Sequence, residues 1–248
     1  MKFRDHFSGV ATGYAAFRPQ YPTALFDWLA TISQRHDVVW DCACGSGQAS
    51  RTLAPHFDRI IATDASHVQV AAATAIEKTH FVVARSEQAP LAEDSVDLVT
   101  VAQALHWFVG EAFFQEVRRV VRPGGVFAAW TYGMPHVGSQ TIEKAVHDFI
   151  DGPLGSYWPP EIRLVLDGYA SIDLPFEELE APDFELRVEW KLARFLGFVR
   201  TWSAVGRFYE EHGEDPVPRL AAEVEDLWGN EEDCQPISWR LALRAARV

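Results

Sequence analysis

The sequence predicts an α/β fold in which helices cover both faces of a doubly wound, mostly parallel sheet. Apolar runs of strand length alternate with helical patterns about five times in the first 132 residues. Most of these runs are continuous, as expected for parallel strands that are buried on both faces. A glycine-rich turn directly follows the first run. Because strand–helix–strand crossovers are right-handed, such a chain builds a Rossmann-like sheet.

The first half of the chain supplies the strands and helices of this sheet in order. The expected strands cover residues 38–43, 59–64, 80–85, 95–103 and 126–132. The expected helices cover residues 24–33, 48–57, 65–78 and 111–121. Ser66 is suited to cap the third of these helices, because its side chain can accept a bond from the first helical turn. Pro123 and the two glycines after it stop the fourth helix.

The second half is expected to be less regular. Residues 133–183 contain many glycines, prolines and scattered aromatics, and they predict a small, partly helical cap after the fifth strand. Residues 184–190 alternate in the manner of a strand, and residues 191–213 and 216–229 each predict one helix. Residues 237–246 fit either a last strand that closes the sheet or a helix.

The charge balance argues against nucleic acid as a partner. The chain has 22 basic and 35 acidic residues, for a net charge of −13. Such a field repels a polyphosphate unless a local basic patch exists. Arg118, Arg119 and Arg122 are the nearest candidate for a patch, but they lie where a helix ends, and cations there stabilise the helix dipole.

The three cysteines, Cys42, Cys44 and Cys234, do not form a zinc-binding pattern, because no second cysteine pair exists. We interpret them as reduced thiols of a cytoplasmic protein. The amino-terminal residues lack the apolar core of a signal peptide, and no apolar run reaches transmembrane length. We therefore expect no membrane partner, no bound metal, and a monomer or weak homodimer.

The glycine turn is compatible with two ligand classes. Gly45 and Gly47 allow backbone N–H groups to approach either a pyrophosphate or an amino-acid carboxylate. The dinucleotide pattern G-x-G-x-x-G is incomplete, because Ser50 stands where the third glycine is expected. Asp41, just before the turn, would repel a pyrophosphate but can pair with an ammonium group. An amino-acid-bearing ligand such as S-adenosylmethionine is therefore favoured over a nicotinamide dinucleotide.

A second carboxylate, Asp64, ends the second expected strand, 23 residues after Asp41. This is close to the spacing of the acid that binds ribose hydroxyls in nucleotide-binding sheets. The alternative is that Asp64 only caps the helix that follows it.

Several segments, taken together and in order, resemble the class I S-adenosylmethionine-dependent methyltransferases, and within them the type 11 group that includes trans-aconitate methyltransferase-like proteins. The segments are "GYAAFRPQYP" (13–22), "WDCACGSGQAS" (40–50), "IATDAS" (61–66), "ARSEQAPLAEDSVDLVTVAQALHWF" (84–108), "RRVVRPGGVFAAWTYG" (118–133) and "ISWRLALRAAR" (237–247). Two positions depart from the family pattern. Ala43 stands where glycine is usual, and Arg85 stands where an acid is common.

The resemblance implies the cofactor S-adenosylmethionine, the product S-adenosylhomocysteine, and one methyltransferase domain over residues 1–248. Its parts would be an amino-terminal segment and cofactor-binding core (1–132), the cap (133–183), and strands and helices that complete the sheet (184–248). The implied cofactor-binding residues are Tyr14, Arg18, Asp41, Ala43, Gly45, Gly47, Asp64, Ala65, Ser86, Glu87, Gln103, Ala104 and Trp107. In particular, Arg18 would lie near the cofactor's carboxylate, unless "FRPQYP" is only a surface turn.

The methyl acceptor is expected between the sheet edge and the cap. The candidate acceptor-binding residues are Tyr21, His106, Trp107, Trp130, Tyr132, Trp158, Arg163 and Trp202. His106 could act as a catalytic general base, position the acceptor, or be an ordinary core histidine. The first candidate for the acceptor is a small organic acid such as trans-aconitate. Two alternatives remain, a protein that binds the cofactor without turnover and a nicotinamide-dependent oxidoreductase.

Overall fold

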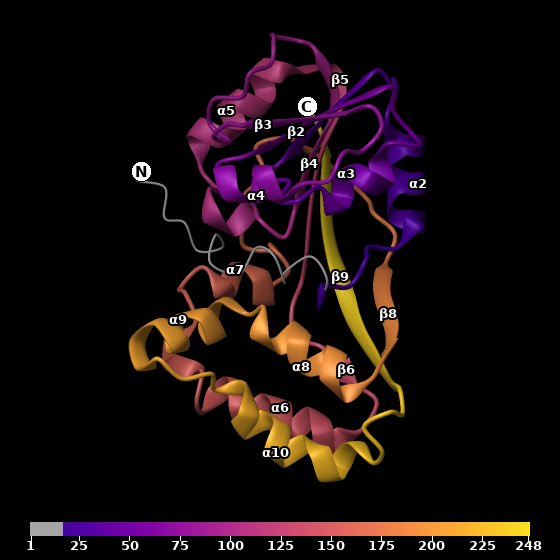
Figure 1. The fold of residues 1–248 in the computed structure, drawn as a ribbon. Coiled ribbons are helices and arrows are strands. Elements are labelled where there is room, and N and C mark those ends of the chain that lie inside the picture. The colour runs from indigo at the N-terminus through magenta and orange to yellow at the C-terminus, as the bar shows by residue number, and fades with distance from the viewer. Residues whose placement is uncertain (1–16) are drawn as a thin grey trace.

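The computed structural model describes residues 17–248, which form one mixed sheet with helices around it (Figure 1). The strand order is β3-β2-β1-β4-β5-β9-β6, and the first five of these strands are parallel. The parallel strands are β1 (Val38–Cys42), β2 (Arg59–Asp64), β3 (Thr79–Val83), β4 (Val96–Ala102) and β5 (Val121–Tyr132). The predicted doubly wound sheet is confirmed.

The strand order reverses at β1, which lies between β2 and β4. The chain leaves β1 toward β2 and β3 on one side and returns to β4 and β5 on the other. In an open parallel sheet, ligands bind beyond the carboxyl ends of the strands at such a switch point. The glycine turn that follows β1 lies there.

Strand β9 (Gln235–Arg247) closes the sheet and confirms the strand interpretation of residues 237–246. Its second half runs antiparallel to β5, from the pair Tyr132–Leu241 to the pair Val126–Arg247. Its first half pairs with β8 (Phe184–Trp190), and the short strands β6 (His136–Val137) and β7 (Glu177–Leu179) also pair with it. In Figure 1, β9 is the long yellow strand that joins the upper and lower parts of the molecule.

Helices pack on both faces of the sheet. One apolar cluster includes Leu25 of α2 (Thr23–Ile32) and Leu53 of α3 (Gln48–Leu53). The other includes Phe113 and Val117 of α5 (Glu111–Val120). Burial of these apolar side chains is the main term that stabilises the layers, at about 25 cal/mol per Å².

The lower part of the molecule is helical. It contains α6 (Gln140–Asp151), α8 (Leu192–Arg200), α9 (Ser203–His212) and α10 (Val217–Trp228), with α7 (Ile162–Leu166) closer to the sheet (Figure 1). Helix α10 packs against α6 and α8. The helical layer therefore combines segments from before and after β8.

Three of the predicted helices are wrong in extent. The helix expected over 48–57 ends at Leu53 and is followed by a turn. Residues 191–213 form two helices, α8 and α9, because the chain is extended at Trp202 and the Thr201 hydroxyl donates to the carbonyl of Phe198 (2.6 Å) instead of continuing the helix. The helix expected over 65–78 is only α4 (His67–Ala72), after which the chain is extended at Ala73 and leads into β3. Ser66 caps α4 as predicted, accepting from the Gln69 N–H (3.3 Å).

Candidate functional site

The turn after β1 has an unusual backbone. Ala43, Gly45 and Gly47 have φ values of 55°, 55° and 89°, which side-chain-bearing residues rarely adopt. A Cβ at Gly47 would lie 2.6 Å from the ring of Phe81, so this position requires glycine. Ala43 adopts the same conformation with a Cβ, at a cost of about 1–2 kcal/mol. The departure at Ala43 thus stores strain in the turn.

Asp41 lies below this turn and is completely buried. Its carboxylate accepts hydrogen bonds from the hydroxyls of Ser50 (2.5 Å) and Thr100 (3.0 Å). Burial raises the pKa of Asp41 to about 6, and the nearby charge of Asp64 acts in the same direction. Ser50, which replaces the third glycine of the dinucleotide pattern, therefore holds a carboxylate at the switch point.

Asp64 connects the end of β2 to the same turn. Its two carboxylate oxygens accept from the backbone N–H groups of Gly45 (2.9 Å) and Ser66 (2.8 Å). Helix α4 is capped by Ser66, so Asp64 does not serve as its cap. Ala65 lies between these two residues, at the carboxyl edge of the sheet. Asp64 is positioned by the turn and holds the turn in place.

The loop after β3 carries Ser86 and Glu87 in a tight turn between Arg85 and Gln88. Glu116 of α5, which is buried, fixes this loop by accepting from the Ala89 N–H (2.6 Å). Arg119 pairs with Glu116 and also donates to the carbonyl of Leu91 (2.8 Å). The guanidinium lowers the pKa of the Glu116 carboxyl, which therefore stays charged.

Gln103 follows β4 and also has a positive φ, of 55°. Its side-chain amide donates to the carbonyl of Tyr132 (3.1 Å) and accepts from the hydroxyl of Thr131. Ala104, which is mostly buried, precedes a short 3₁₀ helix, η1 (Leu105–Trp107). The ends of β4 and β5 are therefore tied together at the sheet edge.

A cavity of about 80 Å³ opens at this edge, between the sheet and the helical layer. It is lined by Arg18, Gln103, His106, Trp107, Tyr132, Gly133, Met134, Trp158, Ile162, Val165, Phe198, Trp202 and Ser203. Eight of these thirteen residues carry apolar or aromatic side chains. Five of the predicted acceptor-binding residues lie here, namely His106, Trp107, Tyr132, Trp158 and Trp202.

Arg18 is held between the sheet and the helical layer. Its guanidinium donates to the hydroxyl of Tyr132 (3.3 Å) and to the carbonyl of Thr201 (3.1 Å), and it lies over the ring of Phe198. The next residue, Pro19, accepts from the Gln48 side chain at the start of α3 (2.5 Å). The segment "FRPQYP" is therefore built into the site and is not merely a surface turn.

Three of the predicted acceptor-binding residues do not line the cavity. Trp130 is fully buried and packs edge-on against Tyr21 (5.5 Å between ring centroids). Arg163 is exposed on α7, whose inner face is formed by Ile162 and Val165. The third residue is Tyr21 itself. Tyr14, which was predicted to bind the cofactor, lies outside the described residues. The sequence prediction missed Gly133, Met134, Ile162, Val165, Phe198 and Ser203. The apolar pair Ile162 and Val165, three residues apart on α7, was a signal for two of them.

His106 is mostly buried on η1, in contact with the ring of Trp107 (4.6 Å between ring centroids). Its Nδ1 lies 3.0 Å from the hydroxyl of Tyr169. Burial lowers the pKa of His106 to about 3, so the imidazole is neutral at physiological pH. Tyr169 was also missed by the sequence prediction, because nothing in "DGYAS" sets this tyrosine apart from others.

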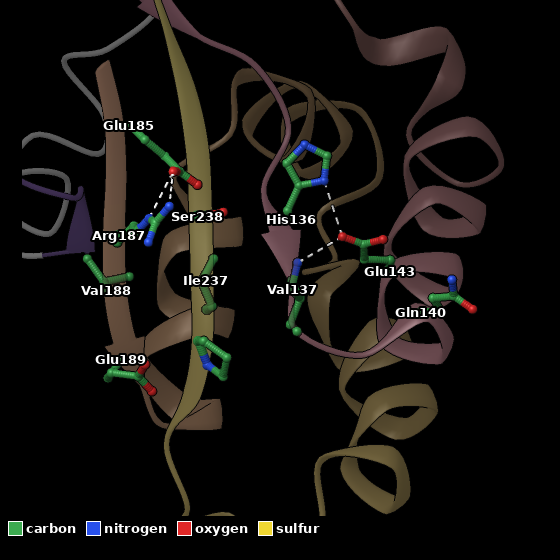
Figure 2. A pocket seen from close by; sticks show the side chains of 12 residues that line it. His136, Val137, Gln140, Glu143, Glu185, Arg187, Val188, Glu189, Ile237 and Ser238 are labelled. Atoms are coloured by element: carbon green, nitrogen blue, oxygen red, sulfur yellow. Dashed lines mark hydrogen bonds and ion pairs between the residues drawn. The ribbon is translucent and has the colours of Figure 1, made fainter. Parts of the chain in front are cut away.

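A second hollow lies away from the strand ends, between β8, β9 and α6 (Figure 2). Its volume is about 500 Å³, and most of its charged side chains pair with each other. Arg187 pairs with Glu185 (2.6 Å) and His136 contacts Glu143 (3.3 Å). These pairs are typical of a solvated sheet face.

Within residues 17–248, no cluster of three or more histidine, cysteine, aspartate or glutamate side chains could hold a metal ion. None of the described helices has both the length and the apolar character that a membrane span requires.

Known proteins with similar sequences or structures identify the fold and the family. Residues 40–129 match the family model described as "Methyltransferase domain". A solved structure from Anaeromyxobacter dehalogenans, named a putative type II methyltransferase, is 41% identical, covers 93% of this chain and 97% of its own, and has a TM-score of 0.85.

Curated relatives agree with this assignment. The malonyl-[acyl-carrier protein] O-methyltransferase of Marinomonas sp. is 31% identical over 73% of each chain. A putative methyltransferase of Dictyostelium discoideum is 29% identical, over 88% of this chain and 84% of its own.

A doubly wound sheet with this turn and these relatives defines a class I S-adenosylmethionine-dependent methyltransferase. The chain belongs to the type 11 methyltransferase-domain family, and its cofactor is S-adenosylmethionine. The oxidoreductase alternative raised by the glycine turn is thereby set aside.

Replacing Gly47 by alanine should destabilise the protein by about 2–4 kcal/mol, because a side chain is strained at this φ and contacts Phe81. The matched control is Gly206→Ala in α9, where a Cβ has no neighbour within 4 Å. This control should be neutral or gain up to about 1 kcal/mol. Urea unfolding of both variants measures the difference, and equal effects in the two would contradict the strain at Gly47.

Asp41→Asn should change how stability depends on pH. Because the pKa of Asp41 rises from 3.8 to about 6 on folding, the folded protein keeps a proton between these values that the unfolded chain has released. Asp41 therefore lowers stability as pH rises through this window, by roughly 3 kcal/mol at most. Asparagine lacks this titration. The variant's free energy of unfolding relative to wild type, measured in urea from pH 4 to 8, should rise with pH; a constant difference would contradict the prediction.

Proposed function

We propose that this methyltransferase acts on a small molecule held in the cavity between η1, α7 and the helical layer. The observation that carries the proposal is the position of the cavity, which begins at Gln103 on the carboxyl edge of the sheet and ends among Trp158 and Trp202. Apolar walls with few polar groups suit a small ligand. The small volume also favours a small acceptor over a polymer.

The residues at the strand ends fit the charges of the cofactor. Asp41 and Asp64 place two negative charges at the turn, which suit a ligand that carries an ammonium and a sulfonium. Arg18, the only cationic side chain among the described residues of the cavity, suits the ligand's carboxylate. A dinucleotide pyrophosphate would instead meet the two carboxylates. This distribution of charge supports S-adenosylmethionine on the basis of the site itself.

In the proposed site, the end of each strand would contact a different part of S-adenosylmethionine. The turn at Ala43, Gly45 and Gly47 would enclose the amino-acid tail, while the N–H groups of Gly45 and Gly47 donate to Asp64 and to the carbonyl of Cys44. Asp64, beside Ala65, would accept the ribose hydroxyls. The turn at Ser86 and Glu87 contacts the adenine. Gln103, Ala104 and Trp107 lie along the methionine part, and Trp107 offers an aromatic face to the positive charge.

The protein's contribution to the reaction is alignment. S-adenosylmethionine, when bound, supplies an activated methyl group for in-line displacement. Trp107, Trp158 and Trp202 confine the acceptor, and the neutral His106 offers a hydrogen bond at the cavity wall. A base is required only if the attacking atom carries a proton at working pH.

Two acceptor classes fit this cavity. Arg18 favours a small organic acid that is methylated on a carboxylate, with trans-aconitate as the first candidate to assay. His106 favours an acceptor with a hydroxyl or amine group, because it presents a neutral ring nitrogen and no charge to pair with a carboxylate.

Calorimetry with S-adenosylmethionine tests the cofactor site. Asp64→Ala should weaken binding by about 10- to 100-fold, the loss expected for charge-assisted hydrogen bonds worth about 1.5–3 kcal/mol. The control is Asp226→Ala, an exposed residue on α10 far from the strand ends. Equal affinity in wild type and Asp64→Ala would remove Asp64 from the site. Binding of NAD without S-adenosylmethionine would overturn the proposal.

A metabolite screen that detects release of S-adenosylhomocysteine tests the acceptor. Turnover should be confined to small compounds and should fall at least tenfold when Trp202→Ala opens the cavity wall. An enzyme that methylates only protein or nucleic acid would contradict a small-molecule acceptor.

A further inference from the structure

Helix α4 buries a polar side chain in preference to an apolar one. Gln69 is only 7% exposed and is the one buried residue of this helix, whereas its neighbour Val68 is 42% exposed. Burial of apolar side chains stabilises a fold, and burial of a polar group without a hydrogen bond opposes it. A local exception of this kind is expected where a residue serves a function.

The side-chain amide of Gln69 makes no hydrogen bond to any group within residues 17–248. Such an amide carries two N–H donors and an oxygen that can accept twice. Neither of its two polar atoms is among the fully enclosed, unpartnered polar atoms of the described residues. The small exposed part of Gln69 therefore includes the amide, which borders open space and not the apolar core.

This open space lies at the glycine turn. Apart from the residues next to Gly45 in the chain, the only described atom within 4 Å of a Cβ placed on Gly45 is Oε1 of Gln69, at 3.8 Å. Because Gly45 has no Cβ, the turn leaves this space open. No hydrogen bond fixes the Gln69 amide, so either its oxygen or its NH₂ group can face the space.

Asp64 borders the same region, and the chain holds Asp64 and Gln69 in a fixed relation. The Ser66 N–H donates to one oxygen of Asp64 (2.8 Å), and the Ser66 hydroxyl accepts from the Gln69 N–H (3.3 Å). The other oxygen of Asp64 accepts from the Gly45 N–H (2.9 Å). Gly45, Asp64 and Gln69 thus border one small region beyond the carboxyl ends of β1 and β2.

An amide complements a carboxylate in the recognition of a hydroxyl group. A hydroxyl has one proton to donate and lone pairs that accept. Asp64 can accept the hydrogen bond of a ribose hydroxyl, but a carboxylate has nothing to donate to the lone pairs. The NH₂ group of Gln69 can donate to them without adding charge beside Asp41 and Asp64. A lysine would instead pair with these carboxylates and compete with the cationic groups of the cofactor.

We propose that Gln69 is a further cofactor-binding residue, whose side-chain amide donates to a ribose hydroxyl of S-adenosylmethionine while Asp64 accepts from the same hydroxyl. A sugar without this hydroxyl would leave both polar side chains without that partner, so the pair selects ribose over deoxyribose. The inference rests on the proposed function, in which Asp64 contacts the ribose, and it adds the donor that Asp64 lacks.

Calorimetry with S-adenosylhomocysteine tests the binding role and needs no methyl acceptor. Gln69→Leu should weaken binding by about 3- to 10-fold, as expected for the loss of one neutral hydrogen bond. The matched control is Gln140→Leu at the exposed start of α6 in the helical layer, which should bind like wild type. Equal affinity in Gln69→Leu and wild type would overturn the proposal, because the amide would then meet only water.

The 2′-deoxy and 3′-deoxy forms of S-adenosylhomocysteine test which part of the cofactor the amide contacts. Wild type should bind the form that lacks the shared hydroxyl about 10-fold more weakly or worse. Gln69→Leu should bind this same form as well as wild type does, because the partner of the amide is already absent. Equal weakening by Gln69→Leu toward both deoxy forms and the parent compound would overturn the assignment to the ribose.

Urea unfolding without ligand separates a binding role from a structural one. Gln69→Leu should have a midpoint no lower than that of wild type, because leucine can be buried without a hydrogen bond. A lower midpoint would show that the amide stabilises the fold itself and would overturn the proposal. Failure of the wild-type protein to bind either S-adenosylmethionine or S-adenosylhomocysteine would instead reject the proposed function.

Discussion

The site depends on one buried carboxylate, Asp41. It accepts hydrogen bonds from Ser50 in α3 and Thr100 in β4, so it joins three elements at the switch point. The raised pKa shows that burying this charge opposes folding, and the neighbouring Asp64 adds to that cost. A cationic ligand would offset both effects. Cofactor binding and stability are therefore coupled through the residue that shapes the turn.

Backbone strain is concentrated where the cofactor and acceptor sites meet. Ala43 after β1, Gln103 after β4 and Tyr169 beside η1 all have positive φ without being glycine. Each is fixed by neighbouring backbone hydrogen bonds, such as that from the Gln103 N–H to the carbonyl of Trp130 (2.9 Å). Strain of this kind persists only where the surrounding structure enforces it. It holds the groups at the strand ends in place before any ligand arrives.

The sequence predicts the cofactor half of the molecule well, because continuous apolar runs specify parallel strands and the strand ends must then share one edge. It predicts the acceptor half less well, because the type of a residue does not fix whether its side chain reaches the cavity or is buried beside it. Trp130 and Tyr132 lie two residues apart on the same face of β5, yet only Tyr132 reaches the cavity. At the break between α8 and α9, the N–H and hydroxyl of Thr201 both donate to the carbonyl of Phe198 and Trp202 is extended, which no helical periodicity reveals.

The sheet and the helical layer share one apolar cluster, in which Trp239 of β9 packs against Phe198 of α8 (5.2 Å between ring centroids). Strand β9 connects the two parts, and at the cavity Arg18 bridges them, because it donates to the hydroxyl of Tyr132 in β5 and to the carbonyl of Thr201 after α8. Trp158 and Trp202 belong only to the helical layer, so exchanging them would reshape the acceptor pocket and leave the cofactor's strand ends intact. Thr131 has no such freedom. Its buried hydroxyl donates to the Gln103 side chain, which also bonds the carbonyl of Tyr132, so Thr131 helps to fix the edge of the sheet that both ligands would share.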